Sequence, residues 1–539
     1  MVNRSALTGR TGEVPERSYA AWLVEEVFPG FGERQAVVCR DVRLSYAELA
    51  GTIRRLAAVF RSLGLGAGTT VALASGNRAE AVCVPFAAHL VGARFLSMPA
   101  DRGPAEYASI AANVPADVLF LDDRISQPCA EAVTAAFAGA RVGSLGPGGP
   151  GFDAMTAARQ ADPDDREGWA GAEQVETVLC SGGTTGLTKC VLHRHRMYET
   201  ILAHPFLPEP VNLLVTSQIC HVGGLYALTS LAQGSTITLL DRFTPEAVIE
   251  ALAGGGITAM MTMPPMLYRL LDHPDLAGVD CSKLRRIMYG ASPITADRAQ
   301  QAVERFGPVL WQLYAQTEAF GIAALTSPDH VLDDGRLLRA AGKPFPDTEV
   351  SVRDEQGLSV TPGESGEICA RGPRIMAGYV NQPELTAAAF HPGGWLRTGD
   401  IGYQDEEGYV FLLDRRNDVI ITGEAGSTIY SPLVENALGA HPAVRAAAVI
   451  PVPHHLYGQA AHAVVVTAPG ARVEPEELGK YVLAELERPV YVPASFEFVD
   501  ALPLTPIGKV DKKALRAPYW TGQDGFLHGT TAAEADAVG

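Results

Sequence analysis

Ser181-Gly-Gly-Thr-Thr-Gly-Leu-Thr-Lys189 is the stretch of this 539-residue chain that decides its fold. It follows residues 176–180, a short apolar run typical of a buried strand. The glycines Gly182, Gly183 and Gly186 allow tight backbone turns, so that amide N–H groups can approach an anion closely. The pattern therefore predicts a strand that opens into an anion-binding loop.

The polar side chains of this loop suit a polyphosphate. Ser181, Thr184 and Thr185 supply hydroxyl donors, and Lys189 supplies a positive point charge. The spacing differs from the common NTPase loop GxxxxGK[ST], because Lys189 lies three residues after the last glycine. Taken alone, the segment also fits a polar, glycine-rich surface loop.

Lysine is scarce in this chain, which makes a lysine within such a loop more informative. Lysine and arginine together number 43. Seven of these are lysines: Lys189, Lys283, Lys343, Lys480, Lys509, Lys512 and Lys513. Arginine is thus the usual cation here, and a lysine in a chemically suggestive loop favours a specific role.

Three further motifs follow in order along the chain. Tyr314-Ala-Gln-Thr-Glu318 offers an aromatic ring for a base, a hydroxyl for a phosphate and a carboxylate for Mg²⁺, which prefers oxygen ligands. Its simpler interpretation is a strand end followed by a helix whose N-cap is Thr317. Trp395-Leu-Arg-Thr-Gly-Asp400 places a carboxylate after a glycine turn, where it could accept hydrogen bonds from ribose hydroxyls. Leu504-Thr-Pro-Ile-Gly-Lys509 places a lysine on a loop before a short helix.

Composition narrows the classes of protein. Hydrophobic residues make up 47% and charged residues 19%, as in an ordinary globular protein. The net charge of −18 disfavours nucleic-acid binding and docking on anionic lipid, since both need clustered cations. At roughly 150 residues per domain, the length suggests about three to four structural units.

The cysteines and the apolar segments predict a cytoplasmic protein without a membrane span. The eight cysteines include no CxxC pair, which favours reduced thiols, and no His/Cys cluster has the spacing of a zinc site. The N-terminus lacks the apolar core of a signal peptide. The longest apolar run, residues 81–98, is interrupted by His89 and Arg94 and reads as a buried helix.

The order of apolar runs predicts an α/β protein. Thr70–Ala74 and Val118–Leu121 resemble strands and Ala79–Val91 a helix, and similar alternation runs from 175 to about 309. Such alternation is typical of mainly parallel sheets covered by helices. Shorter strands over 342–413 suggest an antiparallel region.

A domain boundary is expected after this antiparallel region. We predict a hinge at 415–418, in the charged stretch Asp414-Arg-Arg-Asn-Asp418, because strand-helix alternation restarts after it. Residues 419–520 would form a small domain with a helix over Pro475–Leu486. Residues 521–539 have few large apolar side chains and are expected to be a disordered tail.

Taken together and in this order, the motifs resemble the adenylate-forming superfamily, which includes acyl-CoA ligases, adenylation domains of peptide synthetases and luciferases. The resemblance covers about residues 30–517 and is closest to the acyl-CoA ligase branch. It implies an N-terminal domain over 1–414, with two α/β sandwich-like sheets and a small β-barrel-like region, and a small mobile α+β C-terminal domain. It also implies ATP, Mg²⁺ and coenzyme A as cofactors and substrates, with a carboxylic acid as the acyl donor.

The resemblance implies a role for each matching residue. In the family pattern Lys509 bridges the substrate carboxylate and the α-phosphate, Glu318 binds Mg²⁺ together with Thr185, and Asp418 is the hinge. The remaining positions contact the nucleotide or the acid: Ser181, Gly182, Gly183, Thr184, Thr185, Gly186 and Lys189 (β- and γ-phosphates), Gly290, Ala291 and Ser292 (acyl pocket and adenine), Tyr314 (adenine), Thr317 (α-phosphate), Asp400 and Arg415 (ribose), and His221 (beside the acyl pocket). His195 is expected to be a structural contact.

Several positions depart from the family pattern. Thr188 stands where proline is usual, Cys190 where glycine is usual, and Asp414 replaces a glycine before Arg415. The loop at 423–430 is about two residues longer than usual, at a place that lines the thiol tunnel in the family. These changes raise the question of which thiol is used and of how efficient each half-reaction is.

Three alternatives to an acyl-CoA ligase stay open: a free-standing enzyme that loads a carrier protein, an enzyme specialised for one half-reaction, and a non-catalytic nucleotide-binding relative. The small residues Gly290 and Ala291 leave room for a bulky or long acyl group. The acid itself and the oligomeric state stay open, a homodimer being one option.

Overall fold

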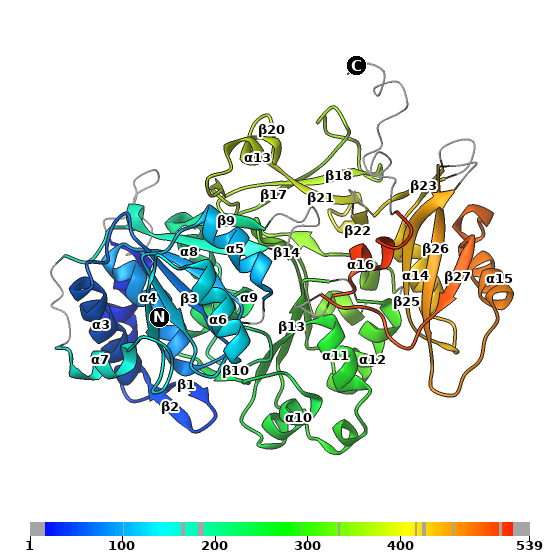
Figure 1. Cartoon of the computed structure of the whole chain (residues 1–539). Helices are drawn as coiled ribbons and strands as arrows, with labels where there is room; N and C mark the ends of the chain where they lie inside the picture. The colour runs from blue at the N-terminus through cyan, green and yellow to red at the C-terminus, as the bar shows by residue number, and fades with distance from the viewer. Residues whose placement is uncertain are drawn as a thin grey trace, which may run out of the picture.

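Two large mixed sheets, a smaller antiparallel sheet and a separate C-terminal sheet form the molecule (Figure 1). The computed structural model describes residues 17–100, 102–162, 168–181, 188–207, 209–292, 294–331, 335–415, 418–422, 427–454, 458–505 and 509–520. Within them, no helix combines the length and the apolar character that crossing a bilayer requires.

The first large sheet has nine strands, and its six central strands are parallel. In spatial order the strands are β16 (Lys343–Pro344), β15 (Ala319–Leu325), β14 (Leu310–Gln316), β13 (Arg286–Gly290), β12 (Ala259–Thr262), β10 (Asn212–Val215), β11 (Thr236–Leu239), β1 (Gln35–Cys39) and β2 (Val42–Ser45). Parallel neighbours need crossover connections, which the intervening helices provide.

The second large sheet has eight strands. In spatial order they are β19 (Gly378–Tyr379), β9 (Lys189–Arg194), β8 (Glu176–Ser181), β4 (Arg94–Met98), β3 (Thr70–Ala74), β5 (Val118–Leu121), β6 (Arg141–Ser144) and β7 (Phe152–Asp153). The strands from β8 to β7 are parallel, whereas β9 runs antiparallel to β8 and β19 antiparallel to β9.

Helices cover both sheets in layers, because alternate strand residues face opposite sides. Val71 and Leu73 join a core with helices between the two sheets, whereas Ala72 and Ala74 join a core on the outer side. The inner helices are α1 (Tyr19–Trp22), α2 (Phe28–Phe31), α3 (Tyr46–Ser62), α4 (Ala79–Val91), α7 (Ala154–Gln160), α8 (His195–Ala203) and α9 (Val222–Leu231). The outer ones are α5 (Pro104–Asn113) and α6 (Gln127–Ala136) on the second sheet, and α10 (Pro245–Ala253), α11 (Pro264–Leu271) and α12 (Ala296–Phe306) on the first.

The smaller sheets follow in the C-terminal third of the chain. The antiparallel sheet contains β17 (Glu349–Arg353), β18 (Gly366–Arg371), β20 (Phe390–His391), β21 (Trp395–Gln404) and β22 (Val410–Arg415), with the helix α13 (Pro383–Ala388) beside it. After it come the pair β23 (Ile420–Thr422) and β24 (Ser427–Ile429), and the sheet β25 (Val444–His454), β26 (Gly458–Thr467) and β27 (Ser495–Phe498). The last helices are α14 (Ser431–Gly439), α15 (Pro475–Leu486) and α16 (Lys512–Arg516).

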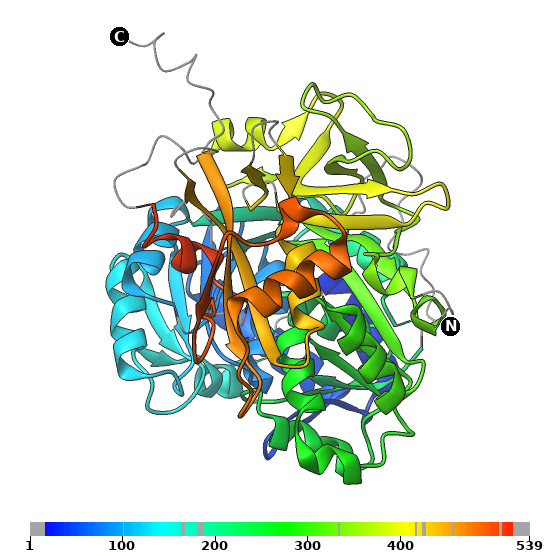
Figure 2. The same cartoon turned by 90° about the vertical axis from the view of Figure 1, so that its right-hand side faces the viewer.

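The C-terminal sheet has its own core, and α14 and α15 pack on it. Figure 2 shows this part, drawn in orange, in front of the two large sheets. The α/β class and the large-plus-small architecture predicted from the sequence are thus confirmed. The division of the chain at 414, 415–418 and 419 stays a prediction.

Candidate functional site

The predicted site residues lie where parallel strands end. In the first large sheet, His221 follows β10, Gly290–Ser292 follows β13 and Tyr314 lies near the end of β14. In the second, Ser181 ends β8. Open α/β sheets bind ligands at the carboxyl ends of their parallel strands, because the loops that follow these strands lie next to one another at that edge. Both large sheets therefore contribute to one candidate site.

Asp400 is the centre of a buried polar network. Its Oδ2 accepts hydrogen bonds from the Tyr314 hydroxyl and from Gln316 Nε2, each at 2.6 Å, and its Oδ1 lies 2.8 Å from Arg415 Nε. The carboxylate is 5% exposed, and Gly399, with φ of 70°, turns the chain directly before it. Burial and the Asp400 charge raise the pKa of the Tyr314 hydroxyl, so it remains a donor. These contacts fix the orientation of the Asp400 carboxylate and of its partner, the Arg415 guanidinium.

The segment Thr317–Glu318 is the turn of a hairpin between β14 and β15, not the start of a helix. The helix N-cap interpretation of Thr317 is therefore wrong, because the chain reverses into an antiparallel strand. A buried histidine holds the turn: His193 Nε2 lies 2.7 Å from the Thr317 carbonyl oxygen. Burial lowers the pKa of His193 to about 4, so the ring is neutral and donates this hydrogen bond.

Tyr379 links the predicted metal ligand to the predicted phosphate lysine. Its hydroxyl donates to Glu318 Oε1 at 2.9 Å, and Lys189 Nζ lies 5.3 Å from the centre of its ring. The strand β19 carries Tyr379 to this place by pairing with β9, whose first residue is Lys189. One side chain from the middle of the chain thus positions a carboxylate and a cation from two other segments.

We expect Tyr379→Phe to raise the KM for MgATP about threefold to tenfold, because the loss of one hydrogen bond to a charged group costs about 1–2 kcal/mol. The ring that Lys189 contacts would remain. Steady-state pyrophosphate-exchange kinetics measure the effect. Tyr409→Phe is the matched control, since its hydroxyl donates to Asp329 away from the site. An unchanged KM in Tyr379→Phe would show that Glu318 needs no such positioning.

Backbone contacts with residues on its N-terminal side fix the position of Lys509. Leu504 and Val510 form an antiparallel bridge, and the Lys509 amide donates to Thr505 Oγ1 at 3.1 Å. Burial, and next the charge of Arg415, lower the pKa of Lys509 to about 8, while Asp400 acts in the opposite direction. In Figure 1 the red segment that ends in α16 lies between the large sheets and the C-terminal sheet. The charges of Asp400 and Arg415 therefore both act on the Lys509 ammonium.

His221 occupies the N-cap position of α9, and its ring is neutral. Burial, together with the charges of Arg102 and Lys509, lowers its pKa to about 4. The Cys180 carbonyl accepts a hydrogen bond from the ring and opposes this shift. The Lys509 effect places the lysine and His221 in one electrostatic neighbourhood, so the predicted catalytic lysine and the predicted acyl-pocket histidine come together.

The segment Gly290–Ser292 leaves β13 with a special backbone. A Cβ at Gly290 would lie 2.3 Å from the Leu313 carbonyl oxygen, so the two strands pack here without a side chain. Ala291 is exposed and has φ of +69°, a left-handed conformation that costs an L-residue about 1–2 kcal/mol. The backbone thus bends sharply where the acyl pocket is expected.

These two positions predict opposite effects on stability. Gly290→Ala should lower the free energy of unfolding by about 1–3 kcal/mol, because the neighbouring backbone must move. Ala291→Gly should leave it unchanged or raise it by up to about 1 kcal/mol, since glycine adopts positive φ without strain. Urea unfolding followed by circular dichroism compares both with the parent protein. Equal destabilisation by the two changes would contradict this account of the turn.

Asp418, the predicted hinge, lies in a charged cluster that connects β22 to the C-terminal part. Its carboxylate pairs with Arg516 Nη1 at 2.7 Å. Nearby, the buried Asp414 accepts hydrogen bonds from the amide and the hydroxyl of Ser431, at 2.7 and 2.9 Å. Burial raises the pKa of Asp414 to about 6. Lys512 Nζ donates to the same Ser431 hydroxyl at 2.6 Å. The aspartate that replaces the usual glycine thus has partners in the C-terminal part.

Part of the predicted site lies outside the described residues: Gly182, Gly183, Thr184, Thr185 and Gly186, together with the side chain of Ser181. The described residues contain no cluster of three or more His, Cys, Asp or Glu side chains suited to a metal ion. Glu318 is one carboxylate, which fits a Mg²⁺ ion held mostly by substrate phosphates and water.

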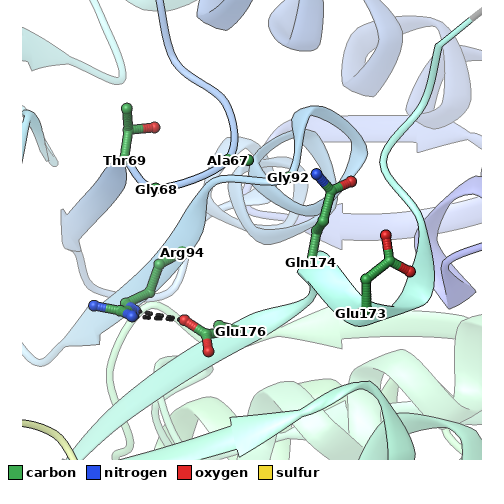
Figure 3. Close-up of a pocket in the computed structure, with 8 residues that line it drawn as sticks. All are labelled: Ala67, Gly68, Thr69, Gly92, Arg94, Glu173, Gln174 and Glu176. Atoms are coloured by element: carbon green, nitrogen blue, oxygen red, sulfur yellow. Dashed lines mark hydrogen bonds and ion pairs between the residues drawn. The ribbon is translucent and has the colours of Figure 1, made fainter.

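A small pocket of about 200 Å³ lies away from this site (Figure 3). Arg94 and Glu176 line it and form an ion pair of 2.6 Å. Both residues begin their strands, β4 and β8. The pocket therefore marks the amino ends of the parallel strands, opposite the edge where the site residues gather.

Sequence reasoning missed four residues that shape the site: His193, Gln316, Tyr379 and Arg102. His193 had a weak signal, because it lies within the conspicuous segment after the phosphate loop. Gln316 lies inside the quoted Tyr314–Glu318 motif but carried no assigned role. Tyr379 and Arg102 gave no local signal, since the contacts that make them relevant join distant segments. His195, expected to be structural, accepts a hydrogen bond from the Tyr19 amide at 2.9 Å.

The fold and the gathered residues define a class of enzyme: adenylate-forming proteins with a nucleotide site on a large domain and a lysine loop from a small one. Comparison with known families supports this directly. The family described as AMP-binding enzyme matches residues 24–380, and the AMP-binding enzyme C-terminal domain matches residues 433–509. The chain belongs to the AMP-binding enzyme family, and the resemblance found in the sequence is confirmed.

Individual relatives cover nearly the whole chain. The medium/long-chain-fatty-acid–CoA ligase FadD8 of Mycobacterium tuberculosis is 33% identical over 502 residues, 89% of this chain and 87% of its own. The fatty acid–[acyl-carrier-protein] ligase ScoC of Streptomyces coeruleorubidus is 30% identical, covering 90% of this chain and 93% of its own. The solved structure of the amide bond synthetase McbA from Marinactinospora thermotolerans is 34% identical with a TM-score of 0.84, over 93% of this chain and all of its own.

Proposed function

We propose that this protein is an ATP-dependent, AMP-forming acyl-CoA ligase. The observation that carries the proposal is the position of Lys509: a lysine from the C-terminal part lies in the electrostatic neighbourhood of Asp400, Arg415 and His221. The family match and the fatty-acid–CoA ligase relative support the reaction class. Adenylation needs a cation between two anions, and Lys509 is our candidate for it.

In the first half-reaction, a carboxylate oxygen of the acid attacks the α-phosphorus of ATP, and pyrophosphate leaves. Both reactants are anionic, so a fixed cation at the developing charge lowers the barrier. Lys509 supplies that cation, and Asp400 with Arg415 orients the nucleotide through its ribose. The neutral ring of His221 lines the acyl side without adding a competing charge.

In the second half-reaction, the thiol of coenzyme A attacks the acyl carbonyl of the adenylate, and AMP leaves. Rotation of the C-terminal part about Asp418 would move Lys509 out of the site and bring the residues of the thiol channel to it. We expect a bulky or long acid, because the side chains of Gly290 and Ala291, the predicted lining of the acyl pocket, are small. The cytoplasmic location and the homodimer stay predictions.

The Glu318 carboxylate is suited to binding Mg²⁺. Glu318 would hold it, with Thr185 as the second protein ligand, and the ion would neutralise phosphate charge. Glu318 Oε1 already accepts the Tyr379 hydroxyl, which leaves Oε2 free of hydrogen bonds among the residues the structure describes. The hydrogen bond to Oε1 thus orients the Glu318 carboxylate, and Oε2 can coordinate the ion.

The test scores two products separately. Purified protein is incubated with MgATP, coenzyme A and a panel of fatty, aryl and other carboxylic acids. Mass spectrometry then quantifies acyl-adenylate and acyl-CoA, and ³²P-pyrophosphate exchange reports the first step alone. We expect at least one acid to give both products. Absence of exchange with every acid would refute a two-step ligase.

Two other acceptors are tested in the same assay. Loading of a carrier protein is favoured by the similarity to ScoC, and direct transfer to an amine by the similarity to McbA. Adenylate formation without acyl-CoA, followed by acylation of a phosphopantetheinyl carrier protein or of an added amine, would identify either one. A thiol or amine acceptor other than coenzyme A would also be consistent with the altered loop at 423–430, of which residues 423–426 lie outside the described residues.

A further inference from the structure

Cys180 and Cys190 face each other at the base of the predicted phosphate loop. They are register partners on the antiparallel strands β8 and β9, and their sulfur atoms are 3.4 Å apart. Both residues are buried, 1% and 0% exposed, on the outer side of the second sheet. All eight cysteines of the chain are free thiols. The two thiols therefore bracket the loop that runs from Ser181 to Lys189.

We propose that Cys180 and Cys190 are a redox-modification site, at which hydrogen peroxide converts the two thiols into a disulfide across the base of the phosphate loop. Directly opposite residues of an antiparallel pair have Cα atoms about 4.5–5.5 Å apart, within the range that disulfides span. Bond formation brings the sulfurs from 3.4 Å to about 2.05 Å. Rotation of two side chains and a small strand shift are enough.

The surroundings favour one reactive thiol and one resolving thiol. A hydrogen bond from the Cys180 thiol, together with the Arg102 charge, lowers the pKa of Cys190. The same hydrogen bond and burial raise the pKa of Cys180. Arg102 is itself buried and donates to the Cys180 carbonyl at 3.4 Å. A thiolate beside a guanidinium is the setting in which cysteines react with peroxide.

The chemistry balances in two steps. The Cys190 thiolate attacks one peroxide oxygen, the O–O bond breaks, and the departing hydroxide takes a proton to leave as water. The Cys180 sulfur then attacks the resulting sulfenic acid, the S–S bond forms, and a second water leaves. Two thiols and one hydrogen peroxide give one disulfide and two waters. Peroxide is close to water in size, so local opening of the strand pair admits it.

The disulfide would act on both halves of the site. The Cys180 carbonyl accepts the His221 hydrogen bond, on the acyl side. The Cys190 carbonyl accepts the Val380 amide at 2.9 Å, beside Tyr379, and Lys189 is the preceding residue. A displacement of about 1 Å at catalytic groups can cost up to ~10²-fold in rate. Oxidation is therefore expected to inhibit, and this effect on activity rests on the proposed function.

Peptide mapping tests the bond itself. The protein is treated with hydrogen peroxide, alkylated and digested with trypsin without reduction. Cleavage after Lys189 separates the two cysteines into peptides 167–189 and 190–194, each with one cysteine. A disulfide-linked pair of these peptides is the expected product. Reduced or singly oxidised cysteines at both positions, with no linked pair, would overturn the proposal.

Kinetics test the consequence independently. Pyrophosphate exchange should fall about tenfold to a hundredfold on oxidation and recover with dithiothreitol. Cys190→Ala, or Cys180→Ala if the first fails to fold, should resist peroxide, whereas Cys129→Ala, at a half-exposed position, should remain sensitive. Inhibition of a Cys190→Ala protein equal to that of the parent would refute control by this pair. A parent protein inactive with every acid would refute the proposed function, while the peptide map still decides the disulfide.

Discussion

Lys509→Ala is expected to lower the rate of pyrophosphate exchange by about 10²- to 10³-fold, which corresponds to about 3–4 kcal/mol of transition-state stabilisation. The proposed role of this lysine is that of a mobile cation between the substrate carboxylate and the α-phosphate, which a neutral alanine side chain cannot fill. Thioester formation from preformed acyl-adenylate should change little, because the proposed role of Lys509 is confined to the first step. This split distinguishes a catalytic role from a structural one.

Lys513→Ala is the matched control. Lys513 is exposed and lies on α16, four residues from Lys509. Its removal subtracts one positive charge from the same region without touching the site, so pyrophosphate exchange should stay within about twofold, as for a screened surface charge. An equal loss of exchange rate in the two variants would show that Lys509 contributes only to the overall positive charge of this region.

The pH dependence of the parent protein follows from the same residue. The pKa of Lys509 is lowered to about 8, and the proposed mechanism needs its charged form. The kcat/KM for ATP, which reports the free enzyme, should therefore fall as pH rises through 8. His221 and His193, with pKa values near 4, contribute no limb near neutrality. Lys509→Arg should retain part of the rate and lose the alkaline limb, since arginine stays charged.

Asp400→Ala is expected to raise the Kd for ATP at least about tenfold and to lower the free energy of unfolding by about 2–4 kcal/mol. The change removes the acceptor of two hydrogen bonds and the partner of Arg415. It leaves the buried Tyr314 hydroxyl unsatisfied, which is costly in itself. ATP titration by calorimetry and urea unfolding measure the two effects.

The control for Asp400 is Glu407→Gln. Glu407 is an exposed carboxylate that pairs with Arg336, in the turn between β21 and β22. Surface pairs of this kind contribute about 0–1 kcal/mol, so both ATP affinity and stability should stay near the parent values. If Asp400→Ala weakened stability but left ATP affinity intact, Asp400 would be a packing residue and the ribose assignment would be wrong.

Strands and helices made of sustained apolar or amphipathic runs could be predicted from the sequence. Thr70–Ala74, Ala79–Val91 and Pro475–Leu486 have the bounds expected for them. The edge strand Ser495–Phe498 was not predicted, because its polar–apolar alternation covers only four residues and the strand is largely exposed. At Thr317, local preference for a cap was overruled by strand pairing, a tertiary effect that the segment alone does not encode.

The candidate site could be predicted as a set of motifs but not as a network. Each motif describes a local loop, whereas contacts that orient its side chains join distant positions: Tyr379 and Glu318 are 61 residues apart, and His193 and Thr317 are 124 apart. Long-range pairs leave no trace in a single sequence. The order of the motifs carried the family assignment because several independent loops agreed.

Because the pKa of Lys509 is lowered, we expect proton uptake by this lysine to accompany nucleotide binding. At pH 8 about half of the free enzyme carries a neutral Lys509, and an arriving polyphosphate favours the charged form. Binding of ATP should then take up a fraction of a proton from the buffer. The binding enthalpy would vary with the ionisation enthalpy of the buffer, and this variation would vanish in Lys509→Arg. The enzyme's affinity for its nucleotide is thereby coupled to the proton activity of its surroundings.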